Sequence, residues 1–166
     1  CEDFSSVVFY GCPVTTINFG IGVQRIPAYF AYGFNNLNFV SIANTVTSIG
    51  DFAFRSCSGL NMINIPNSVT YIGKEAFCFC TGLTNAFVGS GVATIGDYAF
   101  YGCSNLQNFN FIFNNSLTTI GQGAFRYCSN LNVFNIPSST ISIGSAAFSD
   151  CSNLTSITIP ESVTSI

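Results

Sequence analysis

Five cysteines recur at a nearly fixed interval along this 166-residue chain. They are Cys57, Cys80, Cys103, Cys128 and Cys151, separated by 23, 23, 25 and 23 residues. A column of evenly spaced thiols could form disulfides or hold metal ions if the fold brought the sulfur atoms together. Each cysteine ends the same phrase, I-G-x-x-A-F-x-x-C, so its chemistry depends on where that phrase is placed.

Three interpretations of this cysteine column are open. In a degraded copy of the phrase Phe34 stands at the cysteine position, so the column accepts an apolar residue. Buried free thiols are therefore the favoured prediction, because free cysteine packs as a small apolar side chain. A disulfide between stacked coils and a ladder of metal sites remain alternatives. Cys78, two residues before Cys80, is predicted to point outward, and whether Cys1, Cys12 or Cys78 forms a disulfide is left open.

Other catalytic arrangements are poorly supported by the residue types. The chain has no histidine, which excludes Ser-His-Asp and Cys-His catalysis. Asp51, Glu75 and Asp97 lie near the start of the repeated phrase, where we expect carboxylates to cap a turn rather than act as acid and base. We predict no catalytic residue, no cofactor-binding residue, no cofactor and no metal ligand, and hence no enzyme.

The repeat has a strand at its beginning. The unit that opens at Leu60 reads L-N-M-I-N-I-P, and its alternation of apolar and polar residues predicts a short half-buried strand. The inward pairs of successive units are Ile17 and Phe19, Val40 and Ile42, Ile63 and Ile65, Ala86 and Val88, Phe109 and Phe111, Phe134 and Ile136, and Ile157 and Ile159. A unit this short must stack on its neighbours to bury its apolar side.

Two further features follow each strand. One column holds a hydroxyl or small residue, which we expect to bond to the backbone of its own turn; its members are Thr45, Ser68, Gly91, Ser116, Ser139 and Ser162. The phrase I-G-x-x-A-F-x-x-C predicts a short helical turn or an irregular segment on the convex side, since Ile49, Ala53, Phe54 and Cys57 would share one helical face. Its phenylalanines are predicted to form an aromatic spine: Phe54, Phe77, Phe100, Phe125 and Phe148.

These patterns predict a leucine-rich repeat solenoid of about seven stacked coils, with short parallel strands on its concave face. We expect one solenoid over residues 1–166, with degenerate repeats over 1–36 and regular repeats over 37–166. The chain begins at Cys1 without a methionine and ends inside a repeat, so we expect it to be a piece of a longer protein.

The frame I-G-x-x-A-F-x-x-C-S-x-L-x-x-I-x-I-P-x-S-V-T-x-I-G resembles the repeat of the BspA-type leucine-rich family. The resemblance is close over residues 37–166 and looser before them. It implies a surface or secreted protein that adheres to a protein or glycoprotein on host cells, matrix or other microbes. Because the repeat columns of that family are structural, the resemblance carries over no catalytic residue.

The composition limits the partners. Apolar residues make up 48% of the chain and charged residues 7%, against roughly 25% charged in typical soluble proteins. The apolar residues come in short bursts that fall short of the ~20 residues of a spanning helix, so we expect no direct membrane insertion by this segment.

Four Lys and Arg residues cannot form the basic stripe that nucleic acid requires, so we expect no nucleic-acid partner. The oligomeric state is left open.

Function is therefore expected on the outward strand positions. The candidate protein-binding residues are Phe39, Met62, Asn64, Phe87, Asn110 and Asn135. Exposed apolar residues in a polar rim can mark an interaction patch, and the alternative is that a drifting repeat exposes them by chance. Phe79, Tyr101 and Tyr127, between Arg55 and Arg126, are a weaker candidate on the convex side.

The favoured hypothesis is a recognition or adhesion segment that binds a macromolecule along its sheet. The alternatives are a structural spacer and an intracellular protein-interaction scaffold. Asn114 and Asn153 also begin N-x-S/T glycosylation patterns, which matter only if the source is a eukaryote, and their glycosylation is left open.

Overall fold

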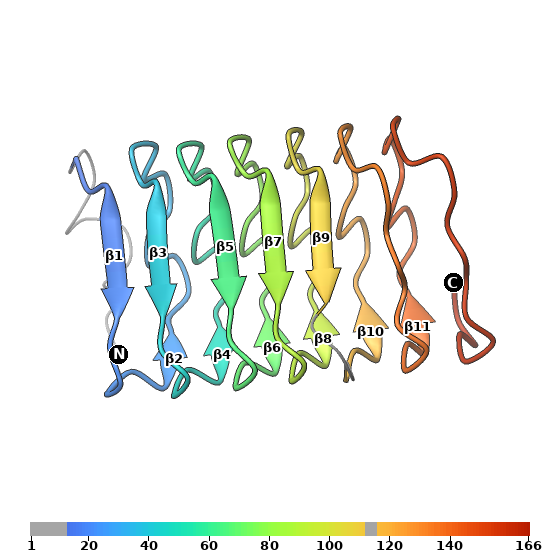
Figure 1. Ribbon diagram of the computed structural model, residues 1–166, viewed down its shortest axis with the longest axis horizontal. Helices are drawn as coiled ribbons and strands as arrows, with labels where there is room; N and C mark the ends of the chain where they lie inside the picture. The colour runs from blue at the N-terminus through green and yellow to red at the C-terminus, as the bar shows by residue number, and fades with distance from the viewer. Residues whose placement is uncertain (1–12, 112–115) are drawn as a thin grey trace.

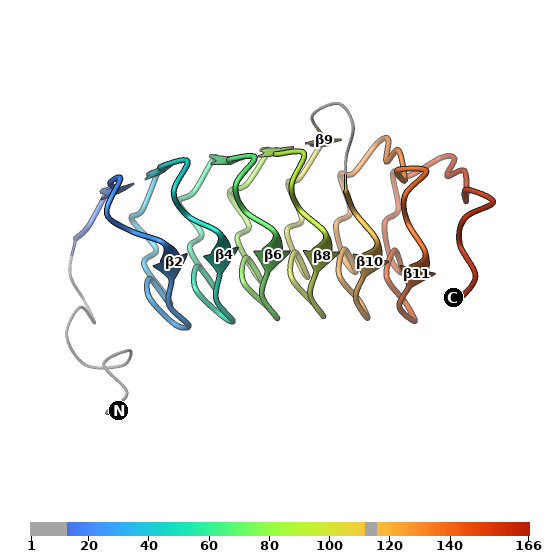
Figure 2. The ribbon, with the colours of Figure 1, turned by 90° about the horizontal axis from the view of Figure 1, so that it is seen from below.

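The computed structural model describes residues 13–111 and 116–166, which form a row of stacked coils without an α-helix (Figure 1). The coils follow one another along a gently curved axis (Figure 2). Three walls surround the core: a row of long strands, a row of short strands, and a wall of turns. The predicted leucine-rich repeat solenoid with parallel strands is confirmed.

The long-strand row forms where the apolar–polar alternation predicts strands. Its members are β1 (Thr16–Phe19), β3 (Phe39–Ile42), β5 (Met62–Ile65), β7 (Asn85–Val88) and β9 (Asn108–Phe111). β1 pairs in parallel with β3, and β7 pairs in parallel with both β5 and β9. Each register joins equivalent columns of the repeat, so Ile63 lies opposite Ala86 and Phe109 continues the same row.

The prediction of seven long strands is wrong for the last two coils. Val133 makes a single parallel bridge to Asn108, and the residues of the seventh coil form no long strand in the described part of the chain. The predicted inward residues Ile157 and Ile159 are exposed there. Each inner coil is covered on both sides, whereas among the described residues no coil covers the outer side of the seventh.

A second row of very short strands was not predicted. It comprises β2 (Arg25–Ile26), β4 (Ser48–Ile49), β6 (Tyr71–Ile72), β8 (Thr94–Ile95), β10 (Thr119–Ile120) and β11 (Ser142–Ile143), paired in parallel in that order. Each strand ends at the isoleucine of the Ile-Gly pair. Two residues are too few to show an alternation, so the sequence pattern carries no signal for this row.

Of the two forms predicted for this segment, the helical turn is wrong and the irregular segment is found, because its backbone amides bond to other coils. The amide of Phe52 donates to the carbonyl of Lys74, and that of Ser56 to the carbonyl of Cys78, each at 2.8 Å. These bonds reach the next coil instead of closing a helical turn. Two residues of each coil also have left-handed φ between 52° and 76°, which an α-helix excludes. They are Tyr29, Phe52, Glu75, Tyr98, Gly123 and Ala146, and Gly33, Ser56, Phe79, Gly102, Tyr127 and Asp150.

The predicted aromatic spine runs through the centre of the core. Phe54, Phe77, Phe100, Phe125 and Phe148 stack in sequence, with centroid distances between 5.1 and 5.4 Å and interplanar angles of at most 11°. The first four are fully buried. Each buried ring contributes on the order of 1.5–3 kcal/mol by leaving water, so this column supplies much of the stability.

The five cysteines of the repeat lie beside this spine as buried free thiols, as favoured by the sequence. Each thiol donates to a backbone carbonyl of the preceding coil; Cys80 reaches the carbonyl of Phe54 at 3.0 Å, and Cys103 that of Phe77 at 3.1 Å. The cysteine column therefore connects neighbouring coils through weak hydrogen bonds. Cys1 and Cys12 lie outside the described residues.

The hydroxyl column also connects coils, which corrects the prediction that it bonds within its own turn. Ser68 donates to the carbonyl of Val46, and Ser162 to that of Thr140, each at 2.7 Å and each in the preceding coil.

Close stacking explains the glycine of the Ile-Gly pair. A Cβ atom on Gly96 would lie 2.8 Å from the backbone of Lys74 and Gly73 in the preceding coil, nearer than carbon atoms can approach.

Candidate interaction surfaces

The six sequence-predicted binding residues all lie exposed on the outer side of the long-strand row. Phe39 is 50% exposed, Met62 48% and Phe87 37%. Asn64, Asn110 and Asn135 are exposed on neighbouring coils. The outward direction of these side chains follows from strand alternation, and that part of the prediction is confirmed.

The structure brings the three apolar members together. Phe39 lies on β3 and Met62 on the adjacent β5, in equivalent columns. Phe87 lies on β7 opposite Asn64, so it is the diagonal neighbour of Met62. Such diagonals are about 7–8 Å apart, within reach of long side chains. We call Phe39, Met62 and Phe87 the sheet patch.

Two asparagine side chains near the patch already form hydrogen bonds within the protein. The Asn108 amide donates to the Asn85 side-chain oxygen at 2.8 Å, and the Asn85 amide donates to the Thr84 hydroxyl at 2.9 Å. These groups have fewer free hydrogen-bonding atoms to offer a ligand. Val133 is 61% exposed on the same face but lies beyond these two asparagines.

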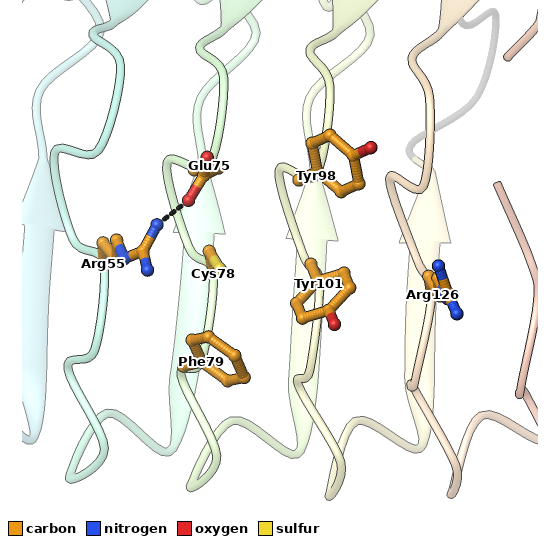
Figure 3. A pocket seen from close by; sticks show the side chains of 7 residues that line it. All are labelled: Arg55, Glu75, Cys78, Phe79, Tyr98, Tyr101 and Arg126. Carbon is orange, nitrogen blue, oxygen red and sulfur yellow. Dashed lines mark ion pairs between the residues drawn. The ribbon is translucent and has the colours of Figure 1, made fainter. Parts of the chain in front are cut away.

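The turn wall holds a second candidate surface. A shallow depression of about 460 Å³ opens between its side chains (Figure 3). Its lining consists of Arg55, Glu75, Cys78, Phe79, Tyr98, Tyr101 and Arg126. The predicted exposure of Phe79 and Tyr127 is confirmed, at 42% and 41%, whereas Tyr101 is half-buried.

One small residue creates the depression. Tyr32, Arg55, Cys78, Tyr101 and Arg126 occupy one column of the repeat on successive coils, and Figure 3 shows Cys78 between Arg55 and Tyr101. Cys78 is placed outward, as predicted, since it lines this depression, but it is only 2% exposed because larger neighbours cover it. The signal in the sequence was a small side chain between two large ones in this column.

Arg55 joins two groups of aromatic rings. It forms an ion pair with Glu75, and its guanidinium carbon lies 5.8 to 5.9 Å from the ring centroids of Tyr32, Phe52 and Phe79. At this distance a cation is attracted to the ring faces. The Nε atom of Arg55 is buried and has no hydrogen-bond partner, so the guanidinium is only partly satisfied.

The aromatic contacts continue toward the C-terminal coils. Phe79 packs edge-on against Tyr101, and Tyr101 packs edge-on against Tyr127, both at 5.3 Å. Arg126 donates to the Tyr127 hydroxyl at 3.0 Å and to an oxygen of Asp150 at 3.3 Å. The outer residues of this wall are therefore connected from coil to coil.

Four of the buried thiols lack the properties of reactive groups. Burial raises the pKa of the Cys78 thiol to about 11, with the nearby Arg55 guanidinium opposing the rise. Burial also raises the pKa of Cys80, Cys103 and Cys128. Nucleophilic and metal-binding cysteines need the thiolate, which a raised pKa disfavours at neutral pH.

Two of the predicted capping carboxylates accept backbone amides, but across coils. Asp51 accepts the Lys74 amide and Asp97 accepts the Gln122 amide, each at 2.8 Å. The third, Glu75, is paired with Arg55 instead. The prediction of caps within the same turn is wrong, because each donor belongs to the following coil.

Residues 13–111 and 116–166 contain no group of three or more His, Cys, Asp or Glu side chains arranged to hold a metal ion. The same residues contain no helix that could cross a bilayer. Asn153 is exposed, and its amide donates to the Asn130 side-chain oxygen at 3.1 Å. Asn114 lies outside the described residues.

Family membership follows from comparison of the repeats. The family model for the BspA type leucine rich repeat region matches residues 2–115 and 110–166, with six copies. The chain belongs to this family. No curated protein shows significant similarity to it.

Three solved structures share the architecture. A leucine-rich repeat protein from Eubacterium ventriosum is 30% identical, with a TM-score of 0.76 over 91% of this chain and 40% of that protein. One from Bacteroides ovatus is 25% identical, with a TM-score of 0.72 over 94% and 46%. The leucine-rich repeat protein of T. pallidum is 31% identical, with a TM-score of 0.67 over 87% and 63%. The chain thus spans between about two fifths and three fifths of these relatives.

Proposed function

We propose that this chain is a non-enzymatic recognition segment of a cell-surface or secreted protein, and that it binds a protein or glycoprotein through its long-strand face. The partner would lie on host cells, in the matrix or on another microbe. The observation that carries the proposal is the sheet patch: three large apolar side chains, each at least 37% exposed, on three adjacent strands.

The surroundings of the patch support a binding role over chance exposure. Asn64 and Asn110 flank Phe87 in its own column, so apolar anchors sit within a polar, uncharged rim. Interfaces commonly combine a few apolar or aromatic anchors with such a rim.

The test is a binding screen of residues 1–166 against host-surface and matrix proteins, followed by the triple variant F39S/M62S/F87S. We expect the variant to lose at least about tenfold in affinity for any ligand found, which corresponds to ~1.4 kcal/mol. Its thermal transition should stay within a few degrees, because the three side chains lie outside the core.

Val133→Ser provides a matched control. It removes an exposed apolar residue from the same face, two coils beyond β7, and should leave the affinity unchanged. Equal binding by the triple variant and the parent would show that the patch is not the site. A chain that binds none of the tested surfaces would favour the spacer or scaffold alternatives.

A further inference from the structure

The segments that build the long-strand face carry no charge. Each runs from the apolar residue that opens a repeat to the second inward position, and none contains Asp, Glu, Lys or Arg. They are residues 14–19, 37–42, 60–65, 83–88, 106–111, 131–136 and 154–159. Asparagine, glutamine, serine and threonine supply their polar groups. All seven acids and four bases of the chain therefore lie away from the strands that are proposed to bind.

A face without charge is a poor match for an average protein surface. Charged residues make up roughly 25% of typical soluble proteins, so a protein partner brings charged side chains to the interface. Burying such a charge against a surface that holds no opposite charge costs free energy, because the ion loses water and gains no partner. A neutral glycan brings hydroxyl groups and C–H faces but no charge. The charge pattern therefore favours a neutral glycan over a bare protein surface.

One row of the sheet face has the residue types and the spacing that suit a sugar. Phe87 on β7 lies opposite Asn64 on β5 and opposite Asn110 on β9, so an exposed ring stands between two exposed amides on adjacent strands (Figure 1). These strands are about 4.8 Å apart. A pyranose ring is similar in size to a phenyl ring, so one sugar can cover Phe87 while hydroxyl groups on its two edges reach the two amides.

The two flanking amides have free hydrogen-bonding atoms. Within the described part of the chain the side chains of Asn64 and Asn110 form no hydrogen bond, unlike those of Asn85 and Asn108 in the neighbouring column. Each amide offers a carbonyl acceptor and an NH₂ donor, so it can pair with a sugar hydroxyl in either role. The face of the Phe87 ring is the negative side of its quadrupole, which attracts the C–H groups of a sugar.

Phe39 extends this surface beyond a single sugar. It lies two strands from Phe87 and in the other outward column, which places it roughly 12 Å away by strand spacing and rise. One pyranose ring is too small to cover both phenyl rings, and the exposed Met62 lies on the strand between them. The matching ligand is therefore an oligosaccharide of several sugars rather than a monosaccharide.

We propose that the long-strand face binds a neutral oligosaccharide carried by a glycoprotein. One sugar stacks on Phe87 between Asn64 and Asn110, and a further sugar packs on Phe39. This inference rests on the proposed function, because it names the chemical class of ligand for the same face. The two can fail separately, since a protein bound through the sheet patch without its glycans would leave the proposed function standing.

The probe is an array of neutral oligosaccharides of mannose, galactose and N-acetylglucosamine, printed beside sulfated and sialylated versions of the same chains. We expect residues 1–166 to bind at least one neutral chain and to gain no affinity from a sulfate or a sialic acid. The affinity should change less than about twofold between about 0.05 and 0.5 M salt, because no ion pair contributes. Binding to no neutral chain, or to the acidic versions alone, would overturn the proposal.

Variants of Phe87 separate ring stacking from general apolar contact. Phe87→Tyr keeps the ring and should retain the affinity for the bound oligosaccharide within about threefold, whereas Phe87→Leu keeps apolar bulk without a ring and should lose about tenfold. Because Phe87 points outward, both variants should keep the thermal transition of the parent. Equal affinities of the two variants would overturn the stacking of a sugar on this ring.

Variants of the amides test the hydrogen bonds. Asn64→Ala and Asn110→Ala should each weaken binding of the oligosaccharide about three- to tenfold, because each removes one hydrogen-bonding partner. Asn132→Ala is the matched control, since it removes an exposed amide two coils beyond Phe87, and it should have no effect. A loss with Asn132→Ala as large as that with Asn64→Ala would refute the assigned row.

Removal of glycans separates this inference from the proposed function. A glycoprotein found in the binding screen is measured before and after enzymatic removal of its glycans, and we expect removal to cost at least about tenfold in affinity. Unchanged binding that is still lost in F39S/M62S/F87S would refute the glycan and keep the sheet patch as a protein-binding site. A free oligosaccharide that binds this triple variant as well as the parent would refute the patch, and with it both proposals.

Discussion

The sheet face and the turn wall differ in how far their outer side chains depend on one another. On the sheet face Phe39, Met62 and Phe87 project from strands whose backbone is paired independently of them. On the turn wall Arg55 lies near three rings, and Phe79, Tyr101 and Tyr127 contact in sequence. A pleated strand leaves its outward positions free to vary, whereas crowded turns couple theirs.

Both surfaces are supported by the same core, so the largest expected effect on stability comes from a substitution in that core. Phe100→Ala should lower the free energy of unfolding by about 3–5 kcal/mol, because it removes a fully buried ring from the stacked spine. Phe39→Ala on the sheet face should cost about 1 kcal/mol or less. Urea denaturation of both variants measures the difference, and similar costs would contradict the division into a shared core and free outer positions.

The next largest expected effect is a gain in stability on removing a buried hydroxyl. Thr140 occupies the column where other coils have Val46, Val69 and Val92, and its Oγ1 is buried without a hydrogen-bond partner. Thr140→Val should raise the free energy of unfolding by about 1–2 kcal/mol, because it removes an unsatisfied polar atom while keeping the shape. Val92→Thr is the reverse change and should destabilise. A Thr140→Val variant that loses stability would show that this hydroxyl has a partner.

The coupling on the two surfaces can be compared directly by double-mutant cycles. Phe79→Ala combined with Tyr101→Ala should give an interaction energy of about 0.5–1.5 kcal/mol, as expected for an edge-on aromatic pair. Phe39→Ala combined with Met62→Ala should be additive within about 0.5 kcal/mol. If the sheet pair were coupled as strongly as the ring pair, the two surfaces would not differ in the way described.

The smallest effect at neutral pH concerns Cys78 and becomes visible only in alkali. The pKa of its thiol rises from an ordinary value near 9 to about 11 in the folded protein. Between these values the folded chain binds more protons than the unfolded chain, so the stability falls as the pH rises. Cys78→Ser should make this fall shallower.

Urea midpoints at pH 8 and pH 10 test this, with the parent chain measured in parallel. The comparison matters because the pKa of Tyr71 is also raised, chiefly by burial, and Tyr71 contributes a fall of the same sign in both proteins. Identical losses in parent and variant would mean that the Cys78 thiol titrates normally.

Much of this architecture could be predicted from the repeat. The strand columns, the stacked Phe54-to-Phe148 spine, the buried free thiols and the outward direction of Phe39, Met62 and Phe87 all follow from period and alternation. The errors about side-chain hydrogen bonds have a common cause. Thr45, Ser68, Asp51 and Asp97 were expected to bond within their own turn, but each bonds to a neighbouring coil.

The turn-wall depression also depends on contacts between coils, which the repeat pattern does not predict. Arg55, Phe79 and Tyr127 were recognisable as exposed candidates, and Cys78 was expected to point outward, but its burial was not predicted. Its burial depends on the size of Arg55 and Tyr101 on adjacent coils, 23 residues before and after it. Aligning the column by coil predicts a small residue between large ones, but not the hollow that they enclose.

The sequence by itself determined the inside of this protein, because a 23-residue period with fixed apolar positions can bury its apolar side in one way, by stacking. The tertiary structure alone decided where the polar atoms bond and which outer side chains meet. Left-handed φ values at Phe52 and Ser56 direct turn amides to the next coil. The physical reason is that stacking brings residues of neighbouring coils within hydrogen-bonding distance of one another, and no local sequence pattern records that contact.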